Sequence, residues 1–274
     1  MHAIFRFYRY INTLSLDIAA GAVVSAQLFA RIFNVQIKTY GLMALGLTVW
    51  IIYTLDHLRD AKKIKHSAST ERHRFHQQNF KVLVCFLVIA VLVDALTIFF
   101  IRRQVLAWGL VLWAIVVLYL TVQQFLRFLK EFFIAGLYTW GVLLLSITVT
   151  SIDLGVHHTL LIVQFAIAAW INLVLFSWFD HVFDERDEQN SFVTIMGNRT
   201  TIFFLYGLFA ASALITLVQV MVFTISGPVM ILAFMIIILL IIFLLRRSLA
   251  KNDLYRLLGD AVFLMPAIYL IWPQ

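Results

Sequence analysis

Three long apolar runs, residues 81–101, 105–122 and 226–245, most restrict how this chain can fold. Each is almost free of charge and, as a helix, is long enough to cross a hydrocarbon core about 30 Å thick. None shows the period-two alternation of a transmembrane β-strand. Since 63% of the 274 residues are hydrophobic and only 13% are charged, the chain lacks the polar surface of a soluble domain. The sequence therefore predicts an all-α, polytopic membrane bundle.

Polar interruptions divide the chain into about nine transmembrane helices within a single domain, residues 1–274. No linker or low-complexity segment separates a second domain. The spans are predicted near residues 14–33, 39–56, 81–101, 105–124, 131–150, 158–179, 201–223, 226–245 and 256–272.

The basic residues are distributed unequally between the two sides of this topology. Of the 21 Lys and Arg residues only four, Arg31, Lys38, Arg102 and Arg103, fall on the side away from the N-terminus, which leaves 17 on the N-terminal side. Positive loops remain in the cytoplasm, so we expect a cytoplasmic N-terminus and an external C-terminus at Gln274. The net charge of +7 is thereby explained by topology, and no nucleic-acid partner is expected.

An acidic motif, D-H-x-x-D-x-(K/R), occurs twice, where the predicted second and sixth spans end. The first copy contains Asp56 and Asp60, and the second contains Asp180 and Asp184. A spacing of four residues places both carboxylates of a pair on one helical face. An even number of spans separates the copies, so both should emerge on the cytoplasmic side and four carboxylates could converge there. The alternative interpretation is two solvated helix ends.

Converging carboxylates near hydrocarbon repel one another unless a cation neutralises them. Because all the candidate ligands are oxygens, a hard cation such as Mg²⁺ is favoured. Basic residues follow the first motif, among them Lys62, Arg72 and Arg74. Such cations, together with Mg²⁺, suit the charge of a diphosphate, although a positive-inside loop explains some of them as well.

These motifs and their positions resemble those of the UbiA superfamily of intramembrane prenyltransferases, in which two aspartate-rich motifs follow the second and sixth of nine helices. The resemblance extends to Ser191 and Gly197 after the second motif and to Lys130 at the start of the fifth span. The chain is a divergent member by this comparison, because its motifs are shortened. Ile64 and Phe176 stand where the family carries further aspartates, with Asp187 and Glu188 as possible substitutes.

The resemblance implies Mg²⁺-dependent transfer of a polyprenyl group from its diphosphate to a lipid-soluble acceptor within the membrane. It implies catalytic and metal-binding roles for the motif carboxylates, and diphosphate contacts for three cations. The metal set is Asp56, Asp60, Asp180 and Asp184, and the diphosphate set is Arg72, Arg74 and Lys130. Two alternatives keep the same fold: a terpene cyclase, which needs no acceptor, and a non-catalytic protein that binds lipid or a membrane partner.

Other polar residues allow further interpretations. Histidines beside the acidic residues could bind iron, manganese or zinc, although the His-rich boxes of membrane oxygenases are absent. These histidines are His57, His73, His76 and His181. Ionisable and polar groups within or near the spans are candidates either for the active cavity or for buried pairs in the bundle. They are Asn12, Asp17, Asp94 and Asp260.

Overall fold

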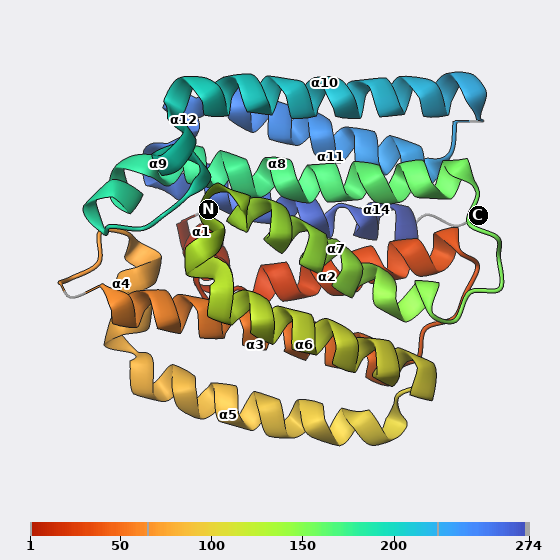
Figure 1. Ribbon diagram of the computed structural model, residues 1–274, viewed down its shortest axis with the longest axis horizontal. Helices are drawn as coiled ribbons and strands as arrows, with labels where there is room; N and C mark the ends of the chain where they lie inside the picture. Colours follow the sequence, from red (N-terminus) through yellow and green to blue (C-terminus); the bar gives the residue numbers. More distant parts are fainter. Residues whose placement is uncertain (1, 65, 224, 272–274) are drawn as a thin grey trace.

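The computed structural model describes residues 2–64, 66–223 and 225–271, and within these ranges the chain forms helices and no strand. Most helices lie side by side along one direction (Figure 1). The α-helices are α1 (His2–Thr13), α2 (Leu16–Ile32), α3 (Thr39–Lys63), α4 (Glu71–Gln78), α5 (Phe80–Thr97), α6 (Arg103–Leu126), α7 (Lys130–Ile147), α8 (Val156–Arg186), α9 (Phe192–Met196), α10 (Asn198–Val222), α11 (Gly227–Leu244), α12 (Arg246–Leu249), α13 (Leu254–Ala261) and α14 (Pro266–Ile271). Short 3₁₀ turns continue or join several of them, at Ile98–Phe100, Arg127–Leu129, Lys251–Asp253 and Val262–Leu264.

Eight helical segments are long and apolar enough to cross a membrane, and α1 with α2 adds a ninth segment bent by 81°. The prediction of a polytopic, all-helical membrane protein with about nine spans is confirmed. The first segment differs from the single predicted span 14–33. Ser15 adopts a left-handed backbone conformation with φ 57°, so the chain changes direction there and α1 becomes a separate helix. The predicted external residue Gln274 lies outside the described residues.

Helices α3 and α8 run straight through the two acidic motifs. The predicted spans end at residues 56 and 179, whereas the helices continue to Lys63 and Arg186. Hydropathy reports where the hydrocarbon ends, and a helix can continue beyond that point because its backbone hydrogen bonds are internal. The continuous helices hold each pair of carboxylates rigidly, one turn apart.

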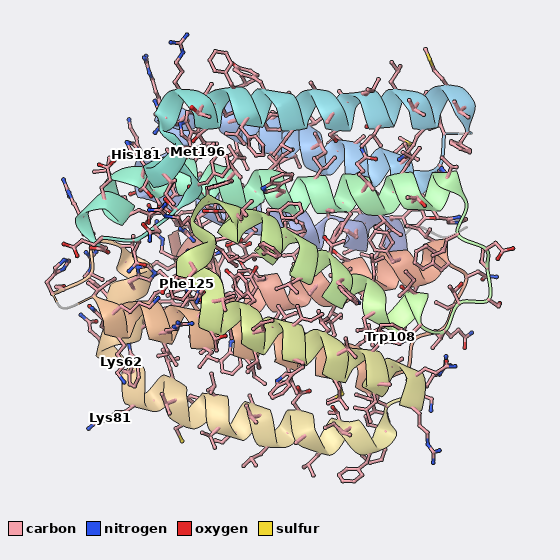
Figure 2. The ribbon with its side chains drawn as sticks, in the orientation of Figure 1. Lys62, Lys81, Trp108, Phe125, His181 and Met196 are labelled. Atoms are coloured by element: carbon pink, nitrogen blue, oxygen red, sulfur yellow. The ribbon has the colours of Figure 1, made fainter. Side chains whose placement is uncertain are left out.

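The loops that follow the motifs meet at one end of the bundle, where α4, α9 and α12 gather (Figure 1). The Ser69 backbone N–H and hydroxyl both donate to the Asp187 carboxylate, the hydroxyl at 2.7 Å. Figure 2 shows Lys62, Lys81 and His181 at this same end and Trp108 toward the other. The prediction that both motifs emerge on one side is therefore correct.

Helix α8 is the central helix and packs against α7, α10, α11 and α13. Its Phe165 ring makes edge contacts with Phe29 at 5.3 Å and Phe263 at 5.9 Å between centroids. Close approach of α13 depends on Gly259, because a Cβ there would lie 2.5 Å from Asn172 Oδ1. Elsewhere α5 packs on α3 and α6 packs on α7. Space remains between these two pairs, and the cavity described below occupies it.

The shared end of the bundle generates a topology prediction. In a Cys85→Ala background, single cysteines at Ser67 and Glu188, both exposed, should react with a membrane-impermeant thiol reagent from the same side. A cysteine at the exposed Asp153, in the loop before α8, should react only from the opposite side. By the positive-inside rule, the first two should be accessible in inverted vesicles. Labelling of Ser67→Cys and Glu188→Cys from different sides would contradict the arrangement.

Candidate functional site

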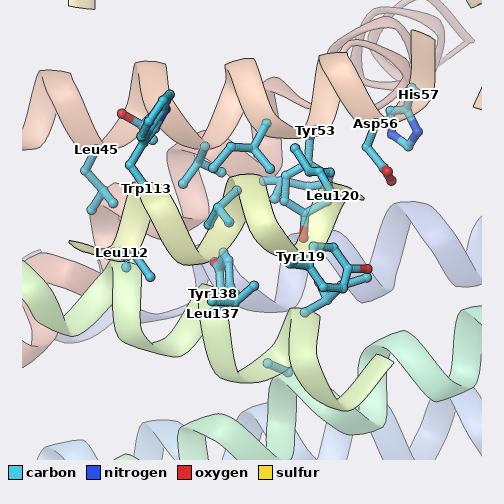
Figure 3. Close-up of a pocket in the computed structure, with 18 of the residues that line it drawn as sticks. Leu45, Tyr53, Asp56, His57, Leu112, Trp113, Tyr119, Leu120, Leu137 and Tyr138 are labelled. Atoms are coloured by element: carbon cyan, nitrogen blue, oxygen red, sulfur yellow. The ribbon is translucent and has the colours of Figure 1, made fainter. Parts of the chain in front are cut away.

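A cavity of about 610 Å³ follows one face of α3 from Gly41 to Asp60. Residues of α2, α4, α5, α6, α7, α8 and α13 contribute to its wall. Its two ends differ in character, as Figure 3 shows: Asp56 and His57 lie at one end, and Leu45 and Trp113 lie at the other. A polar chamber thus continues into an apolar one within the same space.

All four predicted aspartates line the polar end of this cavity. Asp56 accepts a hydrogen bond from Gln123 Nε2 at 3.3 Å. Asp60 pairs with Lys63 Nζ at 3.1 Å, one turn along α3. The structure therefore brings together carboxylates that lie more than a hundred positions apart in the sequence.

Asp180 is the most fully engaged of the four. It accepts hydrogen bonds from the Tyr255 hydroxyl and from the Arg256 guanidinium, both on α13. The Phe179 and Tyr255 rings stack with centroids 4.2 Å apart, which fixes α13 against α8 at this point. The metal-ligand role of all four aspartates stays a prediction, and Asp180 has less capacity for it because its charge already has a partner in Arg256.

The described residues include no group of three His, Cys, Asp or Glu side chains arranged to hold a metal ion. Among these residues, the histidines therefore do not form the iron, manganese or zinc site that the sequence left open as an alternative. Mg²⁺ has a different requirement, since it is commonly held by one or two carboxylates, waters and substrate phosphates and not by a cage of protein ligands. The separated carboxylates Asp56, Asp60 and Asp184 fit that mode, because all their donor atoms are hard oxygens.

Three cations also line the polar end, namely Lys130, Arg256 and Arg72, and the surroundings of Arg72 are described below. Lys130, a predicted diphosphate contact, begins α7 and lines the cavity near the motifs. Arg256 lines it from α13 and was missed in the sequence analysis. The available signal was an Arg and an Asp, Arg256 and Asp260, one turn apart at the start of the last predicted span.

The two predicted diphosphate contacts in the first loop have different surroundings. Arg72 lines the cavity but is buried, and its Nη2 donates to the backbone O of Asn12 at 3.0 Å and to its Oδ1 at 2.9 Å. Arg74 does not line the cavity, and it donates to the backbone oxygens of Ala68 and Ser69. We therefore remove Arg74 from the candidate site, because its guanidinium shapes the loop.

A buried polar network surrounds Arg72. Asn12 Nδ2 lies 2.7 Å from both Asp17 Oδ2 and Asp260 Oδ2, and Arg72 Nη2 lies 3.6 Å from Asp260 Oδ2. Asp260 lines the cavity, whereas Asn12 and Asp17 do not. The network joins the α1–α2 bend, α4 and α13 into one assembly, so its first function is to hold the polar end together.

The histidines pack beside this network. His57 and His73 line the cavity, and the His57 and His76 ring centroids are 5.1 Å apart. Burial lowers the pKa of His73 to about 4, and the nearby Asp60 opposes that effect. His73 is consequently neutral at pH 7 and adds no positive charge to the site.

The loop after the second motif is held by two side chains from the transmembrane helices. The Phe192 N–H donates to Glu131 Oε1 at 2.8 Å, and the Val193 N–H donates to Ser177 Oγ at 3.0 Å. These bonds satisfy N–H groups at the start of α9 that have no partner within the helix. They place Ser191 in the cavity wall, while Gly197, with φ 80°, makes the turn between α9 and α10.

The Arg72 network generates a stability prediction. Arg72→Met should lower the free energy of unfolding by about 3–5 kcal/mol, because it leaves Asp260 buried beside Asp17 without its ion-pair partner. Thermal unfolding in detergent, followed by tryptophan fluorescence, measures the change. The exposed Arg247→Met is the control and should stay within about 0.5 kcal/mol of the parent. A second change, Asp260→Asn, should restore part of the loss. Parental stability of Arg72→Met would show that the network contributes little.

Comparisons with known proteins show what the chain resembles. No protein-family model matches it, and neither does any curated protein. Solved structures do match: a UbiA homologue from Archaeoglobus fulgidus bound to GPP and Mg²⁺ has a TM-score of 0.68 at 13% identity. An apo UbiA homologue from Aeropyrum pernix K1 has a TM-score of 0.67 at 11% identity. A structure described for digeranylgeranylglyceryl phosphate synthase has a TM-score of 0.54 at 12% identity.

Each alignment covers 94% of this chain and 96% of the other. The chain therefore has a UbiA-like fold over nearly its whole length, as the sequence resemblance predicted. At these identities the likeness establishes the fold.

Proposed function

We propose that this protein transfers a polyprenyl group from a prenyl diphosphate to a lipid-soluble acceptor within the membrane, with Mg²⁺ as cofactor. The observation that carries the proposal is the division of one cavity into an acidic end and an apolar end. A prenyl diphosphate has the same division, since a compact, highly charged head is joined to a long hydrocarbon chain. The A. fulgidus homologue bound to GPP and Mg²⁺ supports this assignment by likeness of fold.

The acidic end suits the head group. Mg²⁺ held by one or two of the carboxylates Asp56, Asp60 and Asp184, together with phosphate oxygens, would neutralise the charge that develops on the diphosphate as its C–O bond breaks. Lys130 supplies a positive charge in the same cavity, from the start of α7. Arg256 and Tyr255 balance Asp180, which limits the negative charge that the incoming diphosphate meets. Glu131 and Ser177 act indirectly, because their hydrogen bonds hold the loop that carries Ser191.

The apolar end suits the chain and the acceptor. Leu45, Val49, Leu112 and Trp113 line this part, so a prenyl chain lying along α3 would exchange lipid for protein contacts at little cost. Such walls also exclude water, which would otherwise compete with the acceptor for the prenyl group. Trp113 lines the cavity and is also exposed, so the cavity wall reaches the outer surface of the bundle at this residue.

The first functional prediction treats the two motifs as one site. Asp56→Asn and Asp184→Asn each keep the side-chain size and remove one negative charge. Each should weaken Mg²⁺-dependent binding of farnesyl diphosphate in nanodiscs by about tenfold or more. The double variant should lose less than the sum of the two, because groups that hold one metal–diphosphate unit are non-additive. Asp153→Asn, in an exposed loop outside the cavity, is the matched control.

Small, independent effects of the two changes would support the alternative of solvated helix ends. If the parent protein binds farnesyl diphosphate, turnover separates the remaining alternatives. Diphosphate release that depends on an added acceptor lipid extract supports transfer, release without any acceptor supports a cyclase, and binding without release supports a non-catalytic protein.

The second functional prediction concerns Lys130. Lys130→Gln should reduce affinity for farnesyl diphosphate about tenfold while the bundle remains folded, because it removes a charge-assisted contact to the head group. Lys62→Gln is the control, since Lys62 is exposed at the same end of the bundle and does not line the cavity. Equal affinities of the two variants would assign Lys130 to the positive-inside pattern alone.

A further inference from the structure

One ionisable side chain lies in the cavity wall away from the acidic end. Asp94, on α5, lines the cavity together with Thr48 of α3 and Thr97. The neighbouring wall is apolar and includes Leu45 and Ile98. Thr48 precedes Asp56 by eight residues on α3, which corresponds to about 12 Å along the helix axis. Asp94 is therefore too far from the motifs to share a head group with them.

The hydrogen bonds of Asp94 leave one carboxyl oxygen without a strong donor. The Thr48 hydroxyl donates to Oδ2 at 2.8 Å. The Thr97 hydroxyl has one proton, and its short contact, 2.6 Å, is to the backbone oxygen of Asp94, while Oδ1 lies 3.4 Å away. Among the described residues, no ion pair involves Asp94. A polar group at this depth is costly unless its hydrogen-bonding capacity is used.

A purely structural role accounts for only part of this arrangement. The Thr48–Asp94 bond does fasten α5 to α3. A threonine or asparagine would serve the same purpose with less polar surface to desolvate. Asp94 lines the cavity and has hydrogen-bonding capacity left, so a ligand in the cavity can use its carboxyl group.

We propose that Asp94 is a second polar binding point of the cavity, which accepts a hydrogen bond from a hydroxyl or amino group on an otherwise apolar ligand. This inference rests on the proposed function, because the ligand is expected to have its charged head at the acidic end. The donor group is carried either by the far end of the prenyl chain or by a second lipid molecule, the acceptor. Thr48 is a positioning residue, which orients the carboxylate.

Paired ligands test the proposal. Affinity in nanodiscs with Mg²⁺ is measured for farnesyl diphosphate and for its analogue with a hydroxyl on the terminal carbon. The parent protein should bind the hydroxylated ligand about tenfold more tightly, because a hydrogen bond to a carboxylate in apolar surroundings is strong. Asp94→Leu should remove that preference, and Asp94→Asn, which keeps the shape, should reduce it. Asp153→Asn should retain it in full.

A second arm identifies the source of the donor. Dodecanol binding is measured with unmodified farnesyl diphosphate already saturating the protein, and dodecane is the matched hydrocarbon. If dodecanol binds more tightly than dodecane and this preference depends on Asp94, the proposal is supported with a second lipid as donor. If an Asp94-dependent preference is seen only in the first arm, the proposal is supported with the prenyl chain as donor. The absence of an Asp94-dependent preference in both arms, with farnesyl diphosphate bound normally, overturns this inference alone. Failure of farnesyl diphosphate to bind to the folded parent overturns both the inference and the proposed function.

Discussion

Carboxylates at the membrane boundary must be balanced by positive charge, and most of the polar end of this protein is organised around that requirement. Asp180 has Arg256 and Tyr255, Asp60 has Lys63, and Asp260 has Arg72. The Asp180 and Asp260 pairs tie together α4, α8 and α13, which are widely separated in the sequence, whereas the Asp60 pair lies within α3. Asp56 and Asp184, by contrast, have no ion pair among the described residues. They are the carboxylates with most capacity to bind an added cation.

The helices and loops that carry these charges also fix the shape of the polar end of the cavity. Helices α3 and α8 continue beyond the hydrocarbon as unbroken helices, and the Ser69–Asp187 bonds join the loops that follow them. Glu131 and Ser177 fix the second loop from inside the membrane region. A charged end built this way is rigid, while most side chains of the apolar part, on α3, α5 and α6, need only be hydrophobic, with Asp94 and Thr48 as the polar exceptions. Substitutions in the apolar part could therefore change which prenyl chain or acceptor binds without altering the acidic end.

Long apolar runs and repeated motifs were sufficient to predict the class of fold, because they are local patterns with a fixed helical period. The convergence of Asp56, Asp60, Asp180 and Asp184 was predictable because an even number of spans separates the two motifs, which places both on one side of the membrane. The bend at Ser15 was not predictable, since a left-handed residue leaves no trace in hydropathy. The hydrogen-bond partners of Arg72 and Arg74 were not predictable either, and neither was the position of Arg256 in the cavity wall. Tertiary contacts decide which cations face the cavity. A basic loop gives the same sequence signal whether its residues bind a ligand, the backbone or a buried carboxylate.

A structure of the protein with Mg²⁺ and a non-hydrolysable prenyl diphosphate tests the central claim most directly, namely that one ligand spans the acidic and apolar ends of the cavity. The account predicts the diphosphate between the carboxylates of α3 and α8, beside Lys130, with the prenyl chain along α3 toward Leu45. A diphosphate bound at the exposed basic loops, or a chain lying outside the cavity, would contradict it.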